Sequence, residues 1–219
     1  MPNKIPLVIA TGNPGKIDEI KALLAGFPIE VKSLNDFGPI PEVEEDGNTF
    51  DENAYKKASF TAKILGIPAL ADDSGLMVKA LDGAPGVLSA RYAGENATDE
   101  QRVVKLLKEM EGETDRRAAF ECVLSIAVPS GPALTYEARC EGLIALQPAG
   151  QNGFGYDPVF FYPPLNKTFG QMTIAEKGEV SHRGKALQEL KSEFDKVLIW
   201  IHRHMPPEEK FLYNQNKEQ

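Results

Sequence analysis

Cysteine is scarce in this chain of 219 residues, which contains only Cys122 and Cys140. Two cysteines are too few for a disulfide framework, and their spacing is not that of a metal-binding motif. Both fall in segments with strand-like alternation. We therefore expect two buried free thiols in a protein of a reducing compartment.

Long apolar runs are also lacking. No stretch is long and apolar enough to form a membrane-spanning helix, and the first residues lack the apolar core of a signal peptide. Basic residues are outnumbered, with 24 Lys and Arg against 32 Asp and Glu and a net charge of −8. This balance disfavours binding to nucleic acid or to a membrane surface. We expect a cytoplasmic protein that can bind an anionic small molecule where a local basic pocket or a metal ion offsets its charge.

The order of expected elements predicts an α/β protein with a mixed sheet. A buried strand at 5–10 precedes an amphipathic helix, for which Asn13 suits the N-cap and Pro14 the first position. Capping residues at Thr49 and Thr98 begin two further helices, and a final helix begins near Ser181. Alternating apolar residues between Phe120 and Cys140, with a turn in the middle, predict a long hairpin. Helices interspersed with both kinds of strand imply a mixed sheet. There is no internal repeat, and the residues from 206 onward form a polar tail.

The first motif that could bind a ligand is TGNPGK at residues 11–16, between the first strand and the first helix. Its glycines let backbone N–H groups approach a ligand, and the free N–H groups of a helix start attract phosphate. It is not a Walker A loop, because two residues separate the glycines and Ile17 stands where the Ser or Thr should be. A turn that serves folding alone is the competing interpretation.

Two acidic clusters follow. Glu44 and Glu45 lie in a loop before the capped helix, and Asp72 and Asp73 end a buried strand in ADDSG. Carboxylates suit magnesium, which binds substrate phosphates through one or two of them, and a second carboxylate can take a proton from water. A solvated acidic loop and an Asx turn are the structural alternatives.

Two further segments complete the set. GFGYDP at residues 153–158 places Phe154 between two glycines, where its ring can stack on a base or simply anchor a loop. Lys177, and His182 with Arg183 in SHRGK, can neutralise phosphate and hydrogen-bond a flat heterocycle. Basic residues at a helix start oppose the helix dipole, which favours a functional interpretation.

Together and in this order, these segments resemble the inosine triphosphate pyrophosphatase family. The resemblance covers TGNPGK, EEDGNTFDENAYKKA, ADDSGLMVKALDGAPGVLSARYAG, GFGYDPVFF and EKGEVSHRGKAL, nearly the whole chain before the polar tail. It implies a magnesium-dependent hydrolase that converts ITP, dITP and XTP into monophosphate and pyrophosphate. It also implies a long curved mixed sheet in one two-lobed domain at 1–205, with the active site in the cleft between the lobes, and a homodimer.

The resemblance also assigns roles residue by residue. The catalytic carboxylates would be Asp73, the proton acceptor, and Asp72. The metal ligands would be Glu44, Glu45 and Asp73. The phosphate loop would consist of Thr11, Gly12, Asn13, Pro14, Gly15 and Lys16. The remaining substrate contacts would come from Lys57, Ser74, Phe154, Gly155, Tyr156, Asp157, Lys177, His182 and Arg183.

Two other functions fit the same segments. A nucleotide sensor would use the phosphate loop without hydrolysis, although it would not need both carboxylate clusters. A pyrophosphatase of similar architecture would act on modified pyrimidine or canonical nucleotides. The SHRG segment favours purines, through the resemblance alone.

Overall fold

A computed structural model describes residues 4–41 and 43–205 of the chain. The polar tail expected at 206–219 lies outside the described residues. The strands are β1 (Ile5–Ile9), β2 (Ile29–Ser33), β3 (Ala69–Val78), β4 (Arg117–Ala127), β5 (Ala133–Ile144), β6 (Phe160–Tyr162) and β7 (Lys167–Thr168). The α-helices are α1 (Pro14–Leu23), α2 (Phe50–Leu65), α3 (Asp99–Glu109), α4 (Ile174–Val180), α5 (His182–Ser192) and α6 (Phe194–His204). The short 3₁₀ helices are η1 (Leu34–Phe37), η2 (Lys79–Leu81), η3 (Gly86–Arg91), η4 (Pro163–Leu165) and η5 (Phe169–Gln171).

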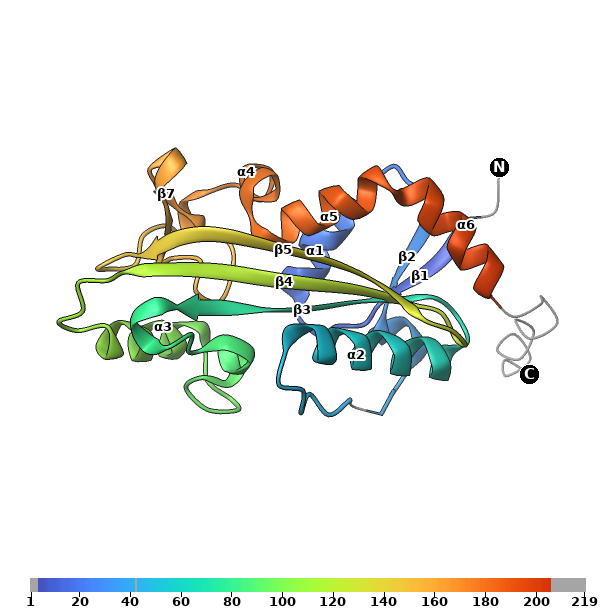
Figure 1. The fold of residues 1–219 in the computed structure, drawn as a ribbon, viewed down its shortest axis with the longest axis horizontal. Helices are drawn as coiled ribbons and strands as arrows, with labels where there is room; N and C mark the ends of the chain where they lie inside the picture. Colours follow the sequence, from blue (N-terminus) through green and yellow to red (C-terminus); the bar gives the residue numbers. More distant parts are fainter. Residues whose placement is uncertain (1–3, 42, 206–219) are drawn as a thin grey trace. The chain divides into compact units, whose positions relative to one another are not determined.

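The strands form one seven-stranded sheet in the order β2-β1-β3-β4-β5-β6-β7 (Figure 1). β1 pairs in parallel with β2 and β3, whereas β6 pairs antiparallel with β5 and β7. The sheet is therefore mixed and helices flank it, which confirms the α/β prediction. β4 and β5 are neighbours joined by residues 128–132, as expected for the long hairpin.

The chain divides into two compact units. The first unit contains the residues up to Asp72, Leu124–Tyr136 and the residues from Glu189, and the second contains Asp73–Val123 and Glu137–Gln188. The expectations of a single two-lobed domain and of a cleft that holds the active site stay predictions.

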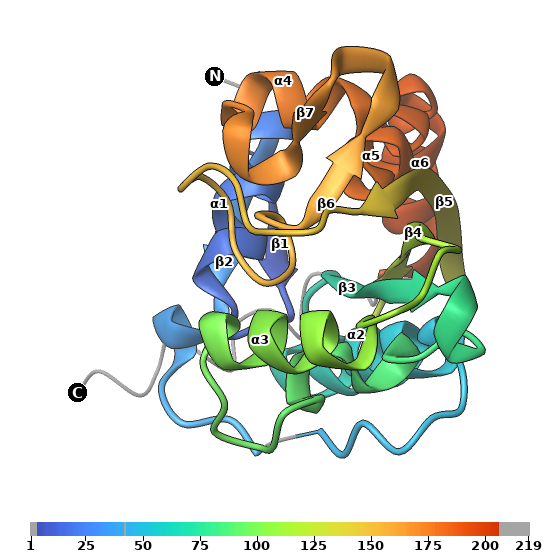
Figure 2. The same ribbon diagram turned by 90° about the vertical axis from the view of Figure 1, so that its left-hand side faces the viewer.

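Where α2 packs on the strands of the first unit, the buried cluster is built largely from small side chains. Ala58 and Ala62 of α2 are fully buried against Val8 of β1 and Ala69 of β3. Figures 1 and 2 show α2 on one side of these strands and α6 on the other. Alanine has the highest helix propensity and lets a helix lie close to a sheet, so the same residues form α2 and fix its distance from β1.

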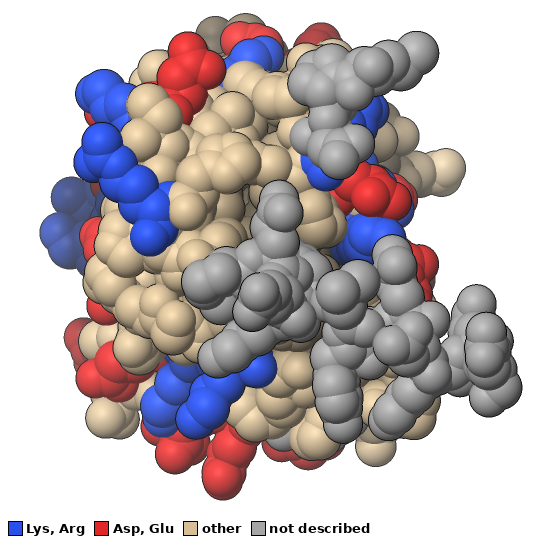
Figure 3. Space-filling view, turned by 90° about the vertical axis from the view of Figure 1, so that its right-hand side faces the viewer, with Lys and Arg blue, Asp and Glu red and all other residues tan. Residues whose placement is uncertain are grey.

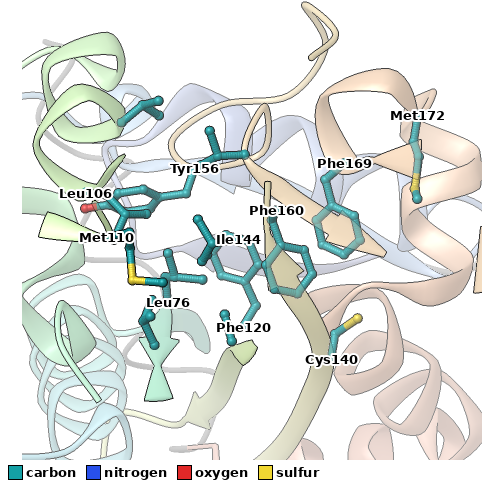
Figure 4. Close-up of a cluster of buried hydrophobic side chains, with 14 residues drawn as sticks. Leu76, Leu106, Met110, Phe120, Cys140, Ile144, Tyr156, Phe160, Phe169 and Met172 are labelled. Carbon is teal, nitrogen blue, oxygen red and sulfur yellow. The ribbon is translucent and has the colours of Figure 1, made fainter. Parts of the chain in front are cut away.

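A buried cluster of the second unit is rich in aromatic side chains (Figure 4). Phe120 of β4 contacts Phe160 and Phe169, with ring centroids 4.7 and 5.9 Å away. Cys140 lies in the same cluster, fully buried. Burial raises the pKa of its thiol to about 11, so the thiol stays protonated and unreactive at neutral pH.

The structure corrects three expectations about local structure. Asp72-Asp73-Ser74-Gly75 is not a turn, because β3 continues through it from Ala69 to Val78. The apolar residues between Leu76 and Leu81 predict a strand, but β3 ends at Val78 and Lys79–Leu81 form a 3₁₀ helix. The last helix is two helices, α5 and α6, that meet at Glu193. The chain passes from the second unit to the first at Glu189, within α5.

The described residues visible in Figure 3 form no broad basic field. On the described part of that face, Lys and Arg side chains lie beside Asp and Glu, around a larger uncharged area. No helix within the described ranges is long and apolar enough to cross a membrane.

Candidate functional site

The first unit brings together two lysines on one aspartate. Lys16 Nζ lies 2.6 Å from Asp72 Oδ1 and 3.3 Å from the main-chain oxygen of Asp72. Lys57 Nζ donates to the same main-chain oxygen at 3.1 Å and to Glu45 Oε2 at 3.1 Å. Asp72 is completely buried, while the Glu45 side chain is 42% exposed. The ammonium groups of Lys16 and Lys57 therefore meet at Asp72, and the more exposed Glu45 carboxylate lies next to Lys57.

The loop before α1 is held by its own side chains. Asn13 caps α1 by accepting a hydrogen bond from the Lys16 N–H at 3.3 Å, and the Asn13 N–H donates to Thr11 Oγ1 at 3.2 Å. Pro14 occupies the first helical position, as the sequence predicts. Because Lys16 belongs to the first turn of α1, the cap also directs its side chain toward Asp72.

A pocket of about 470 Å³ opens beside these residues in the first unit. Its walls include Thr11 and Gly12 of the loop, and Glu45 and Lys57. Other lining residues come from η1 and the following segment: Asn35, Pro39, Ile40, Pro41 and Val43. The pocket thus joins the predicted phosphate loop to the predicted acidic loop.

The acidic loop is anchored by residues that the sequence interpretation did not single out. The Gly47 N–H donates to Asn53 Oδ1 at 2.8 Å, and the Asn48 N–H donates to Glu52 Oε2 at 2.7 Å. Asn53 is buried in α2, one turn before Lys57. The motif NAYKKA therefore serves twice, since Asn53 holds the loop and Lys57 pairs with Glu45. The signal in the sequence was a polar amide, Asn53, among the apolar residues of an alanine-rich helix.

The second unit gathers cations around Phe154. Lys177 Nζ lies 4.8 Å from the centroid of its ring, and the Arg183 guanidinium carbon lies 5.6 Å from it. Lys177 also pairs with Asp157 Oδ2 at 2.6 Å, with both side chains buried. Arg183 donates to Ser74 Oγ at 2.9 Å. Motifs that lie far apart in the sequence therefore meet at one aromatic ring.

His182 is buried beside this group. Its ring stacks on Phe120, with centroids 4.6 Å apart and planes 12° apart. Asp73 belongs to β3 in the same unit and is 7% exposed. Tyr156 donates from its hydroxyl to the Ser89 main-chain oxygen at 2.9 Å, so it anchors the loop while Phe154 remains half-buried.

The predicted metal ligands do not form a ready-made cluster. Glu44 is exposed on the acidic loop, next to Glu45. Among residues 4–41 and 43–205, no three His, Cys, Asp or Glu side chains are grouped so that they could hold a metal ion. Magnesium commonly keeps several waters and binds through one or two carboxylates together with substrate phosphates. The half-exposed Glu45 carboxylate at the pocket fits that mode of binding.

Comparison with known proteins identifies the family. A model of the Ham1 family matches residues 7–193. The chain belongs to the Ham1 family. A dITP/XTP pyrophosphatase from Syntrophobacter fumaroxidans is 65% identical over 196 residues, 90% of this chain and 84% of that protein. One from Desulfotalea psychrophila is 56% identical over 202 residues, 92% of this chain and 91% of that protein.

Solved Ham1 structures share the fold. The structure of a HAM1 protein from Coxiella burnetii matches with a TM-score of 0.80 and 42% identity, covering 88% of this chain and 99% of that one. The sequence motifs quoted above all lie within residues 7–193, so the Ham1 match extends over both clusters of side chains.

One helix of the site was not expected from the sequence. α4 carries Lys177, and it begins with a capping box in which Thr173 Oγ1 accepts from the Glu176 N–H at 3.2 Å. The spacing of Thr173 and Glu176 was the available signal. Lys167 and the Thr173 cap lower the pKa of Glu176 to about 2, so the cap keeps its charge throughout the neutral range.

The junction of α4 and α5 depends on a glycine. A Cβ at Gly184 would lie 1.9 Å from the main-chain oxygen of Gly178. We expect Gly184→Ala to lower the free energy of unfolding by roughly 3 kcal/mol, because backbone atoms would have to separate. Thermal unfolding followed by circular dichroism measures this. Gly12→Ala is the matched control, since nothing lies within 4 Å of a Cβ there. Equal melting temperatures for the two variants would contradict the expectation.

Proposed function

We propose that this protein hydrolyses the non-canonical purine nucleotides dITP, ITP and XTP to the nucleoside monophosphate and pyrophosphate, and so cleanses the nucleotide pool. The observation that carries the proposal is the convergence of Lys16 and Lys57 on Asp72, beside a pocket that includes Glu45. It occurs in a chain that is 65% identical to a dITP/XTP pyrophosphatase. A triphosphate requires this concentration of positive charge in a protein of net charge −8.

The first unit would bind the triphosphate. Thr11, Gly12 and Lys57 line the pocket, so the loop backbone and the Lys57 ammonium group would contact the phosphates there. Lys16 is 14% exposed at its side chain and lies at the start of α1, where the helix dipole also favours an anion. Phosphoryl transfer requires chiefly such positioning and charge stabilisation, without a covalent nucleophile on the protein.

Magnesium is the cofactor that these side chains would take. Glu45 and Glu44, with Asp73, would hold the ion together with substrate phosphates. An ion held by these carboxylates would supply positive charge beside the phosphates. Asp73 would orient the attacking water and accept its proton. Asp72 would act mainly by fixing Lys16, its partner at 2.6 Å.

The second unit would recognise the base. Phe154 offers a ring face for stacking, and Lys177 and Arg183 beside it carry donors only. Hypoxanthine and xanthine present a 6-oxo acceptor, whereas adenine presents a 6-amino donor that would leave these groups mispaired. In this arrangement Lys177 would contact the base, whereas the sequence had also suggested that it could neutralise phosphate. His182 would support Arg183 from its stacked position on Phe120.

A product assay tests the proposal. The protein is incubated with Mg²⁺ and dITP, ITP, XTP, dATP, GTP, CTP or UTP, and the products are separated by ion-exchange chromatography. We expect monophosphate and pyrophosphate from the first three, well above the others. Orthophosphate, or equal turnover of canonical nucleotides, would overturn the proposal. Binding of dITP without turnover would instead support a sensor. Omission of Mg²⁺ tests the cofactor.

We also propose that the protein is a cytoplasmic homodimer, as its resemblance to the pyrophosphatase family implies. Light scattering after size-exclusion chromatography tests the dimer, since the mass of one chain is 24.0 kDa.

Gly12 offers a direct test of phosphate binding. Nothing lies within 4 Å of a Cβ built there, and the residue lines the pocket. We expect Gly12→Ala to leave the melting temperature unchanged and to raise KM for dITP at least about tenfold, because the methyl group would occupy the space of a phosphate oxygen. Steady-state kinetics and a thermal melt measure both. An unchanged KM would remove the Gly12 backbone from the phosphate site.

A further inference from the structure

Asp99 connects the start of α3 to the loop that carries Phe154. Its Oδ2 accepts a hydrogen bond of 2.6 Å from the backbone N–H of Gly155, which lies 56 residues later in the chain. Both residues belong to the second unit. Asp99 is absent from the residues to which the sequence assigned a role.

The Asp99 carboxylate is itself held in place. Arg102, one turn later on α3, pairs with Oδ1 of Asp99. The same guanidinium donates to the main-chain oxygens of Ala90 at 2.5 Å and Ala97 at 2.9 Å. The Thr98 cap, with Gln101, fixes the first turn of α3. A carboxylate constrained in this way is a rigid acceptor, and its charge strengthens the hydrogen bond to Gly155.

The bond from Asp99 acts on one of the two peptide groups that flank Phe154. The Phe154 N–H donates to Asp157 Oδ2 at 2.9 Å, and the Gly155 N–H donates to Asp99. With both peptide planes held, the backbone angles of Phe154 are set, and so is the direction of its Cα–Cβ bond. Gly155 has a φ of +61°, a conformation in which glycine is unstrained, so the loop depends on external bonds to hold it.

We infer that Asp99 is a positioning residue that holds the Phe154 ring ready to stack on the purine base. The inference rests on the proposed function, because it takes the ring of Phe154 to be the base-stacking surface. Asp99 acts through Gly155 and touches neither the nucleotide nor the metal ion. Its removal should therefore weaken substrate binding more than it slows the chemical step.

Three variants separate this role from a general effect on stability. Asp99→Ala removes the acceptor, and Asp99→Asn keeps an oxygen acceptor but loses the charge and the ion pair with Arg102. Glu100→Ala is the control, an exposed carboxylate on the same helix turn. We expect Asp99→Ala to raise KM for dITP about tenfold while kcat changes less than about threefold. Asp99→Asn should recover most of the loss, and Glu100→Ala should match the wild type. An unchanged KM, or no recovery in Asp99→Asn, would overturn the inference.

A double-mutant cycle tests whether Asp99 acts through Phe154. In a Phe154→Ala background, Asp99→Ala should add less than about a twofold change in KM, because the ring that it positions is gone. A full tenfold further loss in that background would show that Asp99 acts elsewhere and would overturn the inference.

Hydrogen exchange of the Gly155 amide gives a readout that needs no activity. In the wild type this amide should be protected, in Asp99→Ala it should exchange at least about tenfold faster, and in Asp99→Asn it should stay protected. Equal exchange in the wild type and in Asp99→Ala would overturn the inference. If the wild type turns over no nucleotide, the proposed function fails while exchange still decides whether Asp99 holds Gly155.

Discussion

Asp73→Asn is expected to lower the turnover of dITP about a thousandfold while leaving the protein folded. The amide has nearly the same shape as the carboxylate, but it can neither accept a proton from water nor provide a negative ligand for magnesium. Asp73 is 7% exposed within β3, so the strand fixes the position from which its carboxylate would act. Pyrophosphate release at saturating dITP and Mg²⁺ measures the effect.

The matched control is Asp51→Asn, an exposed carboxylate in the first turn of α2. It should retain wild-type turnover, and both variants should keep the wild-type circular dichroism spectrum. If Asp73→Asn keeps turnover within tenfold of the wild type, Asp73 is not the proton acceptor, and another carboxylate has to be sought.

Lys177→Met is expected to have the largest effect on stability. Lys177 and Asp157 form an ion pair of 2.6 Å with side chains only 5% and 3% exposed. Removing one partner of such a pair leaves the other charge buried without its counter-ion, at a cost of roughly 3–5 kcal/mol. The urea midpoint, followed by far-ultraviolet circular dichroism, should fall accordingly. Binding of dITP should weaken too. The Asp157 oxygen that pairs with Lys177 also accepts a hydrogen bond from the Phe154 N–H, so a displaced Asp157 would no longer hold Phe154.

A second substitution distinguishes the ion pair from simple packing. Adding Asp157→Asn to Lys177→Met removes the uncompensated charge, and the asparagine oxygen still accepts from the Phe154 N–H. The double variant should therefore be more stable than Lys177→Met alone. If the double variant is less stable, the cost of Lys177→Met comes from lost contacts of the Lys177 ammonium group with the rings of Phe154 and Phe169, and not from an Asp157 charge left without its counter-ion.

Much of the local structure follows from short-range signals. The caps expected at Asn13, Thr49 and Thr98 are present, because a cap depends only on a side chain and the next three residues. The hairpin of β4 and β5 likewise follows from alternation around a turn. The short helix α4 was missed, although its Thr173 cap gave the same kind of signal.

The Asp72–Gly75 segment shows where local signals fail. Two aspartates, a serine and a glycine are typical of a turn, yet these residues continue β3. Turn propensity is weak compared with the hydrogen bonds and burial of a strand inside a sheet. Asp72 is completely buried, and Lys16 and Lys57 satisfy its oxygens. The tertiary structure therefore keeps a polar segment in a central strand because cations from two other elements meet it there.

The sequence by itself determined most of the element types, the α/β class and the segments that could bind a nucleotide, because caps, periodicity and motif spacing are local properties of the chain. Only the tertiary structure decided which of these side chains meet. The contacts of Lys16 with Asp72, Lys177 with Asp157 and Asp99 with Gly155 span 56, 20 and 56 residues. Such contacts depend on strand order and on how helices pack against the sheet, and no local pattern encodes either.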